Sequence, residues 1–240
     1  MMQGVLKIGE RVIQDNEFYP LLAQYQLLPR LAREMIVDEA IADIDCTTQE
    51  QEQALAQFYQ QAQITNEEQL QAWLTQAGMT QEQLNKFVTR EIKLEKFKQN
   101  KWTHQLESYF LECKGQLDRV VYSLIRTKEA GIAQELYFRI QEGESQFADL
   151  AREFSEGGEA QTGGLIGPVE LNVPHPRIVQ LLTTLPAGQL SPPTMIGEWW
   201  IILRLEKYLA SQLDDTLRQR LRNDLFQKWL SNQLQQRVSY

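Results

Sequence analysis

The sequence predicts an α+β protein in which a helical domain surrounds an inserted domain with a small sheet. Three observations support this fold class. Between Asp15 and about Leu117, apolar residues recur with the three- and four-residue spacing of an amphipathic helix. From Asp118 onward, strand-like runs alternate with short helical segments and glycine-rich turns. The final segment, residues 211–240, is helical again and has no strand to cover, so we expect it to return to the helical part.

The first part of the chain predicts a strand and turn followed by two helices. The strand and turn occupy residues 5–13, VLKIGERVI, and an apolar stripe runs through residues 16–44. Pro29 lies inside this stripe, and a proline in a helix interior removes a backbone N–H and clashes with the preceding turn. The stripe is therefore expected to form two helices.

Three further helix starts are predicted by a threonine placed three residues before a glutamate or glutamine. They are Thr47 with Glu50, Thr65 with Glu68, and Thr80 with Gln83. In such a capping box, each side chain satisfies a backbone N–H that the first helical turn leaves unpaired. Gly78 predicts the end of the helix before the third start. The third helix is expected to run without a break from Thr80 to Cys113.

A change in composition at Gly115 predicts a domain boundary near residues 114–118. The expected order after it is a strand, two helices, a glycine-rich loop, a short helix, a proline-rich turn and a last strand. These elements correspond to residues 119–126, 128–143, 147–154, 155–168, 175–185, 186–193 and 199–206.

Charge and composition exclude several classes of partner. The chain has a net charge of -8, from 32 acidic and 24 basic residues, and no basic cluster that would follow a nucleic-acid backbone. No stretch approaches the ~18 apolar residues of a membrane span. The cysteines and histidines lack the spacing of metal ligands, so no metal and no cofactor are expected. The opening residues lack the apolar core of a signal peptide, which predicts a cytoplasmic location or export by a route without a standard signal.

Two adjacent tryptophans stand at the head of the last predicted strand, in the sequence GEWWIILRLEKY. Successive side chains of a strand point to opposite faces. Trp199 and Ile201 are therefore expected on one face, and Trp200 and Ile202 on the other. One tryptophan is enough for an ordinary core contact. The second raises the question of a further role, since an aromatic face stacks well on a proline ring.

Residues 118–208 resemble the parvulin family of peptidyl-prolyl isomerases. The resemblance depends on four motifs in the family's order: FADLAREFSEG, TGGLIG, LPAGQLSPP and WWIILRLE. It implies a small, mostly antiparallel sheet flanked by helices, and cofactor-free rotation of X-Pro bonds. In parvulins two neighbouring strands each carry a histidine. Aligned without gaps, these positions are Ser123 and Trp200, and the family's loop Cys or Asp falls on Gly157.

The same resemblance implies a substrate-binding surface for proline. Its expected residues are Leu165, Ile166, Pro174, His175, Ile178 and Trp200. We expect Trp200 to adjoin Ser123 near Ile178 on the open side of the sheet. Alternative interpretations remain for each: Trp200 as a core residue, Ser123 as a small residue that makes room for it, and His175 as an exposed residue at a helix start.

The flanking helices resemble the chaperone domain of SurA-type foldases, with phrases such as LQAWLTQAGMTQEQL. This second resemblance gives a helical domain at residues 1–117, a parvulin-like domain at 118–208 and a C-terminal helix at 209–240 that packs on the first. It implies that the partners are unfolded or proline-containing polypeptides, with a secretion machine as a further partner.

Two functions follow from these resemblances. An amide rotates over a barrier of ~18–20 kcal/mol without any covalent step, so a dry site that favours the twisted amide is sufficient for catalysis. The first hypothesis is therefore a foldase with prolyl isomerase activity, even without the histidines. The second is a holdase chaperone or secretion adaptor whose parvulin-like domain binds proline without accelerating its isomerisation.

Overall fold

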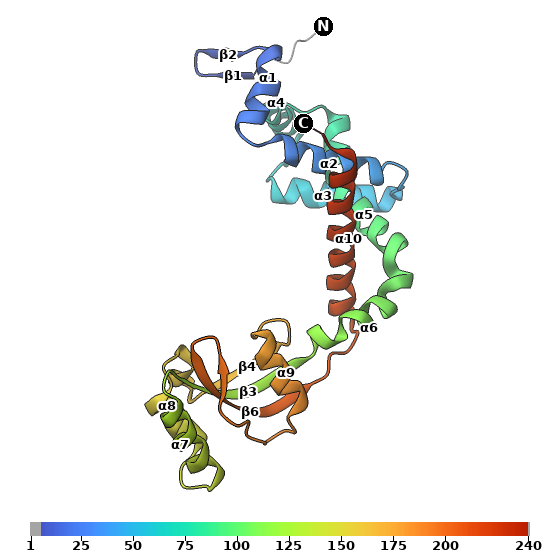
Figure 1. Ribbon diagram of the computed structural model, residues 1–240. Coiled ribbons are helices and arrows are strands. Elements are labelled where there is room, and N and C mark those ends of the chain that lie inside the picture. Colours follow the sequence, from blue (N-terminus) through green and yellow to red (C-terminus); the bar gives the residue numbers. More distant parts are fainter. Residues whose placement is uncertain (1–5, 240) are drawn as a thin grey trace. The chain divides into compact units, whose positions relative to one another are not determined.

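The computed structural model describes residues 6–239, which form two compact units (Figure 1). One unit consists of the chain up to Leu106 together with the chain from Arg218 onward, and the other is Glu107–Leu217. Residues 107–117, before the sheet, and residues 209–217, after the last strand, are thus part of the unit that contains the sheet. The domain limits predicted from the sequence, at residues 118 and 208, place both segments in the helical part. Val5, where the first predicted strand begins, and Tyr240, where the last predicted helix ends, lie outside the described residues.

The helical unit begins with a β-hairpin and continues with helices. Its elements are β1 (Leu6–Ile8), β2 (Arg11–Ile13), α1 (Asp15–Gln24), α2 (Leu28–Ala40), α3 (Thr48–Gln61), α4 (Glu67–Ala77), α5 (Gln81–Trp102) and most of α10 (Asp215–Arg237). Pro29 lies in the first turn of α2, where its missing N–H has no helical partner to lose. The prediction of two helices is confirmed.

Two of the three predicted helix starts, at Thr47 and Thr80, are confirmed as capping boxes. The third, at Thr65, is wrong by one residue. Asn66 caps α4, and its side-chain oxygen accepts a hydrogen bond from the backbone N–H of Gln69 at 2.9 Å. Asparagine ranks above threonine at this position, which accounts for the shift. Gly78 ends α4 in the left-handed conformation, as expected.

The long helix expected between Thr80 and Cys113 is interrupted. The helix α5 ends at Trp102, a 3₁₀ turn η1 (Thr103–Gln105) follows, and α6 (Leu106–Leu117) leads to the sheet. At the interruption, Trp102 leaves the helical region with φ -121° and ψ -9°. Its indole is buried, with ring centroids 6.1 Å from those of both Phe226 and Trp229. Apolar spacing continues through residues 103–113, so the pattern gives no sign of this break.

The prediction that the last helix returns to the helical part is confirmed. Phe226 and Leu230 of α10 are buried in one core with Ile36 of α2 and Leu94 and Trp102 of α5. This core joins the two parts of the chain that flank the sheet unit, because it combines residues up to Trp102 with residues from the last twenty-five positions.

The sheet unit contains four antiparallel strands in the order β4-β3-β6-β5. The strands are β3 (Arg119–Thr127), β4 (Leu165–Glu170), β5 (Thr194–Ile196) and β6 (Trp199–Leu209), and the helices are α7 (Ala130–Gln141), α8 (Phe147–Phe154), η2 (Gly158–Thr162) and α9 (Pro176–Thr184). The antiparallel sheet and the flanking helices confirm the predicted α+β class. The loop predicted over residues 155–168 is wrong in part, because β4 begins within it at Leu165. The strand contains Pro168 but lies at an edge of the sheet, where a strand tolerates proline.

The sheet has a separate core on each face. On one face, side chains of β3 and β6 pack against Ile178 and Leu182 of α9; this is the α9 face. On the other face, Ile125 and Ile202 pack against α7 and α8; this is the α8 face. The expected alternation at the two tryptophans is confirmed, because Ile201 lies in the α9-face core with Trp199 packed against it, whereas Ile202 lies in the other.

Candidate functional site

Ser123 and Trp200, at the expected histidine positions, do not meet in the structure. Across β3 and β6, Ser123 lies opposite Arg204, whereas Trp200 lies opposite Thr127 at the other end of the ladder. Ser123 is two residues from Ile125 in β3, and Trp200 is two residues from Ile202 in β6, so each shares the face of that isoleucine. Both therefore belong to the α8 face, away from Ile178. The expectation that they adjoin near Ile178 is therefore wrong.

Ser123 has a structural hydrogen-bonding role on the α8 face. Its buried Oγ donates to Glu206 Oε1 at 2.6 Å, and Arg204 Nε donates to the same oxygen at 2.8 Å. The Arg204 guanidinium in turn lies 5.0 Å from the centroid of the Phe147 ring. Ser123 and Arg204 thus donate to the same carboxylate oxygen, and these hydrogen bonds connect β3 to β6 and stabilise the sheet.

The expected substrate-binding residues divide between different surroundings. Ile178 is buried in the α9-face core, and Ile166 packs against that core. Leu165 is exposed and lies opposite Ser123. Pro174 is half-buried in the loop before α9. His175 is exposed and caps α9, where its Nδ1 accepts from the backbone N–H of Arg177 at 3.2 Å.

The structure contains a charged cluster on the α9 face that the sequence did not predict. Arg126 lies opposite Ile201 in the β3–β6 ladder, on the same face as the α9 core. Its Nη2 donates to Glu159 Oε2 at 2.9 Å, and the other carboxylate oxygen of Glu159 accepts from Ser155 Oγ at 2.7 Å. The Glu159 side chain is buried, so its carboxylate is shielded from solvent on the side away from Arg126. We call Arg126, Ser155, Gly157, Glu159 and Trp199 the Arg126 cluster.

The guanidinium of Arg126 is held between a glycine and a tryptophan. A Cβ atom added to Gly157 would lie 2.0 Å from both Nε and Nη2 of Arg126, so only glycine leaves room for this side chain. Trp199 is on another side, with its ring centroid 5.5 Å from Arg126 Cζ. An aromatic face attracts a cation at this distance. The Nε atom is buried and has no hydrogen-bond partner, while 34% of the side chain remains exposed.

The cluster changes the electrostatics of its neighbours. Burial, and after it the charge of Glu159, raise the pKa of the Tyr122 hydroxyl above its usual range. Lys128 adds a second cation to Trp199, with Nζ 5.0 Å from the ring centroid. The α9 face thus combines a buried apolar core with one oriented guanidinium near its end.

Sequence alternation contains the signal that finds Arg126. Counting by twos from Tyr122 and Leu124 along β3 reaches Arg126, a charge on an otherwise apolar face. Its partner Glu159 lies in the glycine-rich segment, which no local pattern connects to β3. Only the fold brings the two together.

The Arg126 cluster combines N–H donors with an aromatic ring, and such groups can orient a bound peptide. Among residues 6–239, no group of three or more His, Cys, Asp or Glu side chains is placed to hold a metal ion. Within the same range, no helix combines the length and apolarity needed to cross a membrane.

Comparison with known proteins identifies the sheet unit. Residues 124–207 match the rotamase family, the PPIC-type PPIASE domain. A curated relative, the chaperone SurA of Pseudomonas aeruginosa, is 35% identical over 109 residues, which cover 41% of this chain and 26% of that protein. The chain thus spans about a quarter of the length of the SurA relatives that it matches.

The solved structures that match this chain include two whose names refer to prolyl isomerases or parvulins. One is the crystal structure of peptidylprolyl isomerase PrsA from Bacillus cereus, with 18% identity, a TM-score of 0.49 and coverage of 95% of this chain and 85% of that one. The other is the parvulin domain of PpiD from E. coli, with 29% identity, a TM-score of 0.35 and coverage of 42% of this chain and 97% of that one. From the family match, residues 124–207 are a PpiC-type rotamase domain of the parvulin type, and the similarity to the SurA chaperones covers 41% of the chain.

Proposed function

We propose that this protein is a foldase that accelerates cis/trans isomerisation of X-Pro bonds in unfolded or exported polypeptides. The observation that carries this proposal is the placement of the Arg126 guanidinium. It is fixed by Glu159, Gly157 and Trp199 on the α9 face of a rotamase domain. Relationship to the SurA chaperones supports unfolded polypeptides as clients.

The proposed chemistry requires rotation about one bond. In the planar amide, the nitrogen lone pair is delocalised into the carbonyl, and twisting the bond removes this delocalisation. The prolyl nitrogen then accepts a hydrogen bond that neither planar isomer accepts well. A donor placed on that nitrogen binds the transition state more strongly than the ground states, which lowers the barrier.

Arg126 is the proposed donor, and Trp199 the proposed contact for the proline ring. A guanidinium is planar and presents its N–H donors in a fixed fork, which suits it to hydrogen bonding in one orientation. Because Glu159 and Trp199 already fix its position, little reorganisation is needed when substrate binds.

A second candidate function is binding without acceleration, in a holdase chaperone or secretion adaptor. The observation that favours it is the position of Ser123 and Trp200, which replace the family histidines and lie on the opposite face from Ile178. The secretion machine and the cytoplasmic location stay predictions.

The experiment is NMR exchange spectroscopy on a panel of proline peptides with the full chain and two matched variants. Arg126→Gln removes the proposed donor. Arg204→Gln is the control, because Arg204 also pairs with a glutamate and lies over an aromatic ring, but on the α8 face. We expect acceleration by the wild type, a loss of about tenfold or more in Arg126→Gln, and a much smaller change in Arg204→Gln.

Each outcome has a separate meaning. Equal activity in the wild type and in folded Arg126→Gln protein would exclude Arg126 as the donor. Chemical-shift changes in the peptides without faster exchange would replace the isomerase by the binding function.

A further inference from the structure

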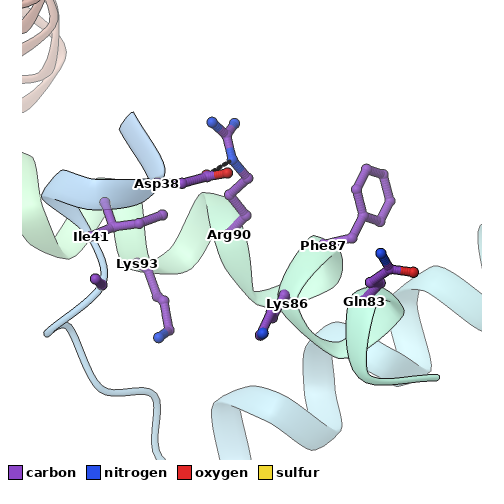
Figure 2. Close-up of a pocket in the computed structure, with 8 residues that line it drawn as sticks. Asp38, Ile41, Gln83, Lys86, Phe87, Arg90 and Lys93 are labelled. Carbon is purple, nitrogen blue, oxygen red and sulfur yellow. Dashed lines mark hydrogen bonds and ion pairs between the residues drawn. The ribbon is translucent and has the colours of Figure 1, made fainter. Parts of the chain in front are cut away.

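The helical unit contains a cavity of about 490 Å³ between α2 and α5 (Figure 2). It is lined by Asp38, Ile41, Ala42, Gln83, Lys86, Phe87, Arg90 and Lys93. Its volume is in the range of sites that enclose a small ligand or a large side chain of a bound peptide. The cavity is in a different unit from the Arg126 cluster.

Phe87 gives the cavity an aromatic surface. It is 53% exposed, yet its ring is held in place from behind, with its centroid 6.4 Å from that of Phe58 in an edge-on arrangement. Phe58 in turn packs edge-on against Trp73 at 4.9 Å. A large aromatic side chain that is rigid and half open to solvent is an anchor suited to an apolar partner group.

The wall beside Phe87 is basic. Lys86, Arg90 and Lys93 are spaced by four and three residues and so follow one stripe of α5. Figure 2 shows the amino groups of Lys86 and Lys93 on one side of the helix in this view, and the Phe87 ring and the Arg90 guanidinium on the other. A chain with a net charge of -8 therefore places three cations and one aromatic ring in the lining of a single cavity.

The three cations differ in how they are neutralised. Arg90 is committed, because Nε contacts Asp38 at 2.6 Å and Nη2 contacts Glu34 at 2.7 Å. Lys86 pairs with Glu82 at 2.7 Å, but both side chains are largely exposed, and such a pair contributes little. Within the part of the chain that the structure describes, no carboxylate pairs with Lys93, which is half-buried at the cavity.

We propose that this cavity binds client polypeptides through an aromatic or large aliphatic side chain flanked by acidic residues. The apolar side chain lies against Phe87 and Ile41, and the flanking carboxylates pair with Lys93 and Lys86. Charge complementarity selects this class of segment over a basic one. The inference rests on the proposed function, in which clients are unfolded chains, and it adds the sequence class that the helical unit selects.

The test measures fluorescence anisotropy of labelled, unstructured peptides with the full chain. The first probe has a central phenylalanine flanked by glutamates, the second has lysines in place of the glutamates, and the third has alanine in place of phenylalanine. We expect the first to bind, with affinity falling as salt rises, and the other two to bind about tenfold or more weakly.

Two variants with matched controls locate the site. Phe87→Ala and Lys93→Glu are expected to weaken binding of the first probe by about tenfold. Phe138→Ala is the control for the aromatic change, because Phe138 has a similar exposure of 51% on α7 of the other unit. Lys207→Glu, at an exposed position of β6, controls for the change in charge.

Prolyl isomerase activity on a short peptide without acidic or aromatic residues separates the two proposals. It should stay unchanged in Phe87→Ala and Lys93→Glu protein. Active enzyme with equal affinity for acidic and basic probes would overturn the cavity proposal and leave the isomerase standing. Binding of the acidic probe that is insensitive to both variants, or a dimer that Phe87→Ala dissociates, would also overturn it.

Discussion

Arg126 and Glu159 lie 33 positions apart in the sequence and form an ion pair of 2.9 Å on the α9 face. The pair connects the end of β3 to η2, and Ser155 holds the second carboxylate oxygen. Since Glu159 is buried, its charge would be unfavourable without Arg126. The ion pair with Glu159 thus holds the Arg126 guanidinium in one orientation.

Gly157→Ala is predicted to displace that guanidinium. The new methyl group would lie 2.0 Å from Arg126 Nε, so the side chain must leave its position over Trp199. We expect a loss of prolyl isomerase activity similar to that of Arg126→Gln, and a decrease of about 1–3 kcal/mol in the free energy of unfolding. Gly158→Ala is the control, since its added Cβ would have no atom within 4 Å. Equal activity of the two variants would contradict the proposed role of the cluster.

Ser123→Ala is predicted to leave isomerase activity within about twofold of the wild type, because its hydroxyl acts on the α8 face. Removing the donor to Glu206 is expected to reduce the free energy of unfolding by about 1 kcal/mol. Exchange rates and urea unfolding of the same sample measure both quantities. A large loss of activity in a variant of normal stability would restore Ser123 to the site.

Asp118 gives the sheet unit an acid-sensitive connection between its two chain ends. Burial alone would raise the pKa of Asp118, but hydrogen bonds from Lys114, Tyr208 and Ser211 outweigh it and lower the pKa from 3.8 to about 2. The same contact raises the pKa of Tyr208 to about 12. The ionised Asp118 therefore adds its full contribution to the free energy of unfolding above pH 3.8, and this contribution is lost as the pH falls through about 2.

Asp118→Asn tests this dependence. We expect the variant to be less stable than the wild type at pH 7 by about 2 kcal/mol, and the two stabilities to converge as the pH approaches 2. Thermal unfolding followed at a series of pH values gives the difference. A difference that stays constant down to pH 2 would show that the charge of Asp118 is not what stabilises the connection.

Leu230→Ala is predicted to destabilise the helical unit by about 2–5 kcal/mol, because Leu230 is fully buried between α10 and the helices of the first part. NMR signals of the sheet unit should persist at denaturant concentrations where those of the helical unit are lost. Leu111→Ala, at a position that is 70% exposed, provides the comparison. Simultaneous loss of both sets of signals would show that the two units unfold together.

Local signals in the sequence are sufficient for much of the secondary structure. The capping boxes at Thr47 and Thr80 and the left-handed Gly78 depend on interactions within one turn, so their residue types predict them. The end of α5 at Trp102 has no such signal. Its position depends on aromatic contacts with Phe226 and Trp229, which come from the other end of the chain.

The features of the candidate site also divide into those that the local sequence determines and those that depend on the fold. Alternation along β6 is a property of the extended chain, so the sequence by itself determined that Trp199 and Trp200 occupy opposite faces. Which residues lie opposite them depends on the register, which shifts at an irregularity between Val121 and Tyr122. Hydrogen bonds between strands set that register, and no local pattern records it.

The sequence thus determined the α+β class, the rotamase motifs and the return of the last helix, because periodicity and short motifs encode them. Only the tertiary structure decided that Arg126, Gly157, Glu159 and Trp199 form one cluster, and that α9 covers the face opposite to Ser123. The physical reason is that a buried charge requires a partner across space. The buried charge is that of Glu159 in η2, and its partner Arg126 comes from β3, 33 positions away in the sequence.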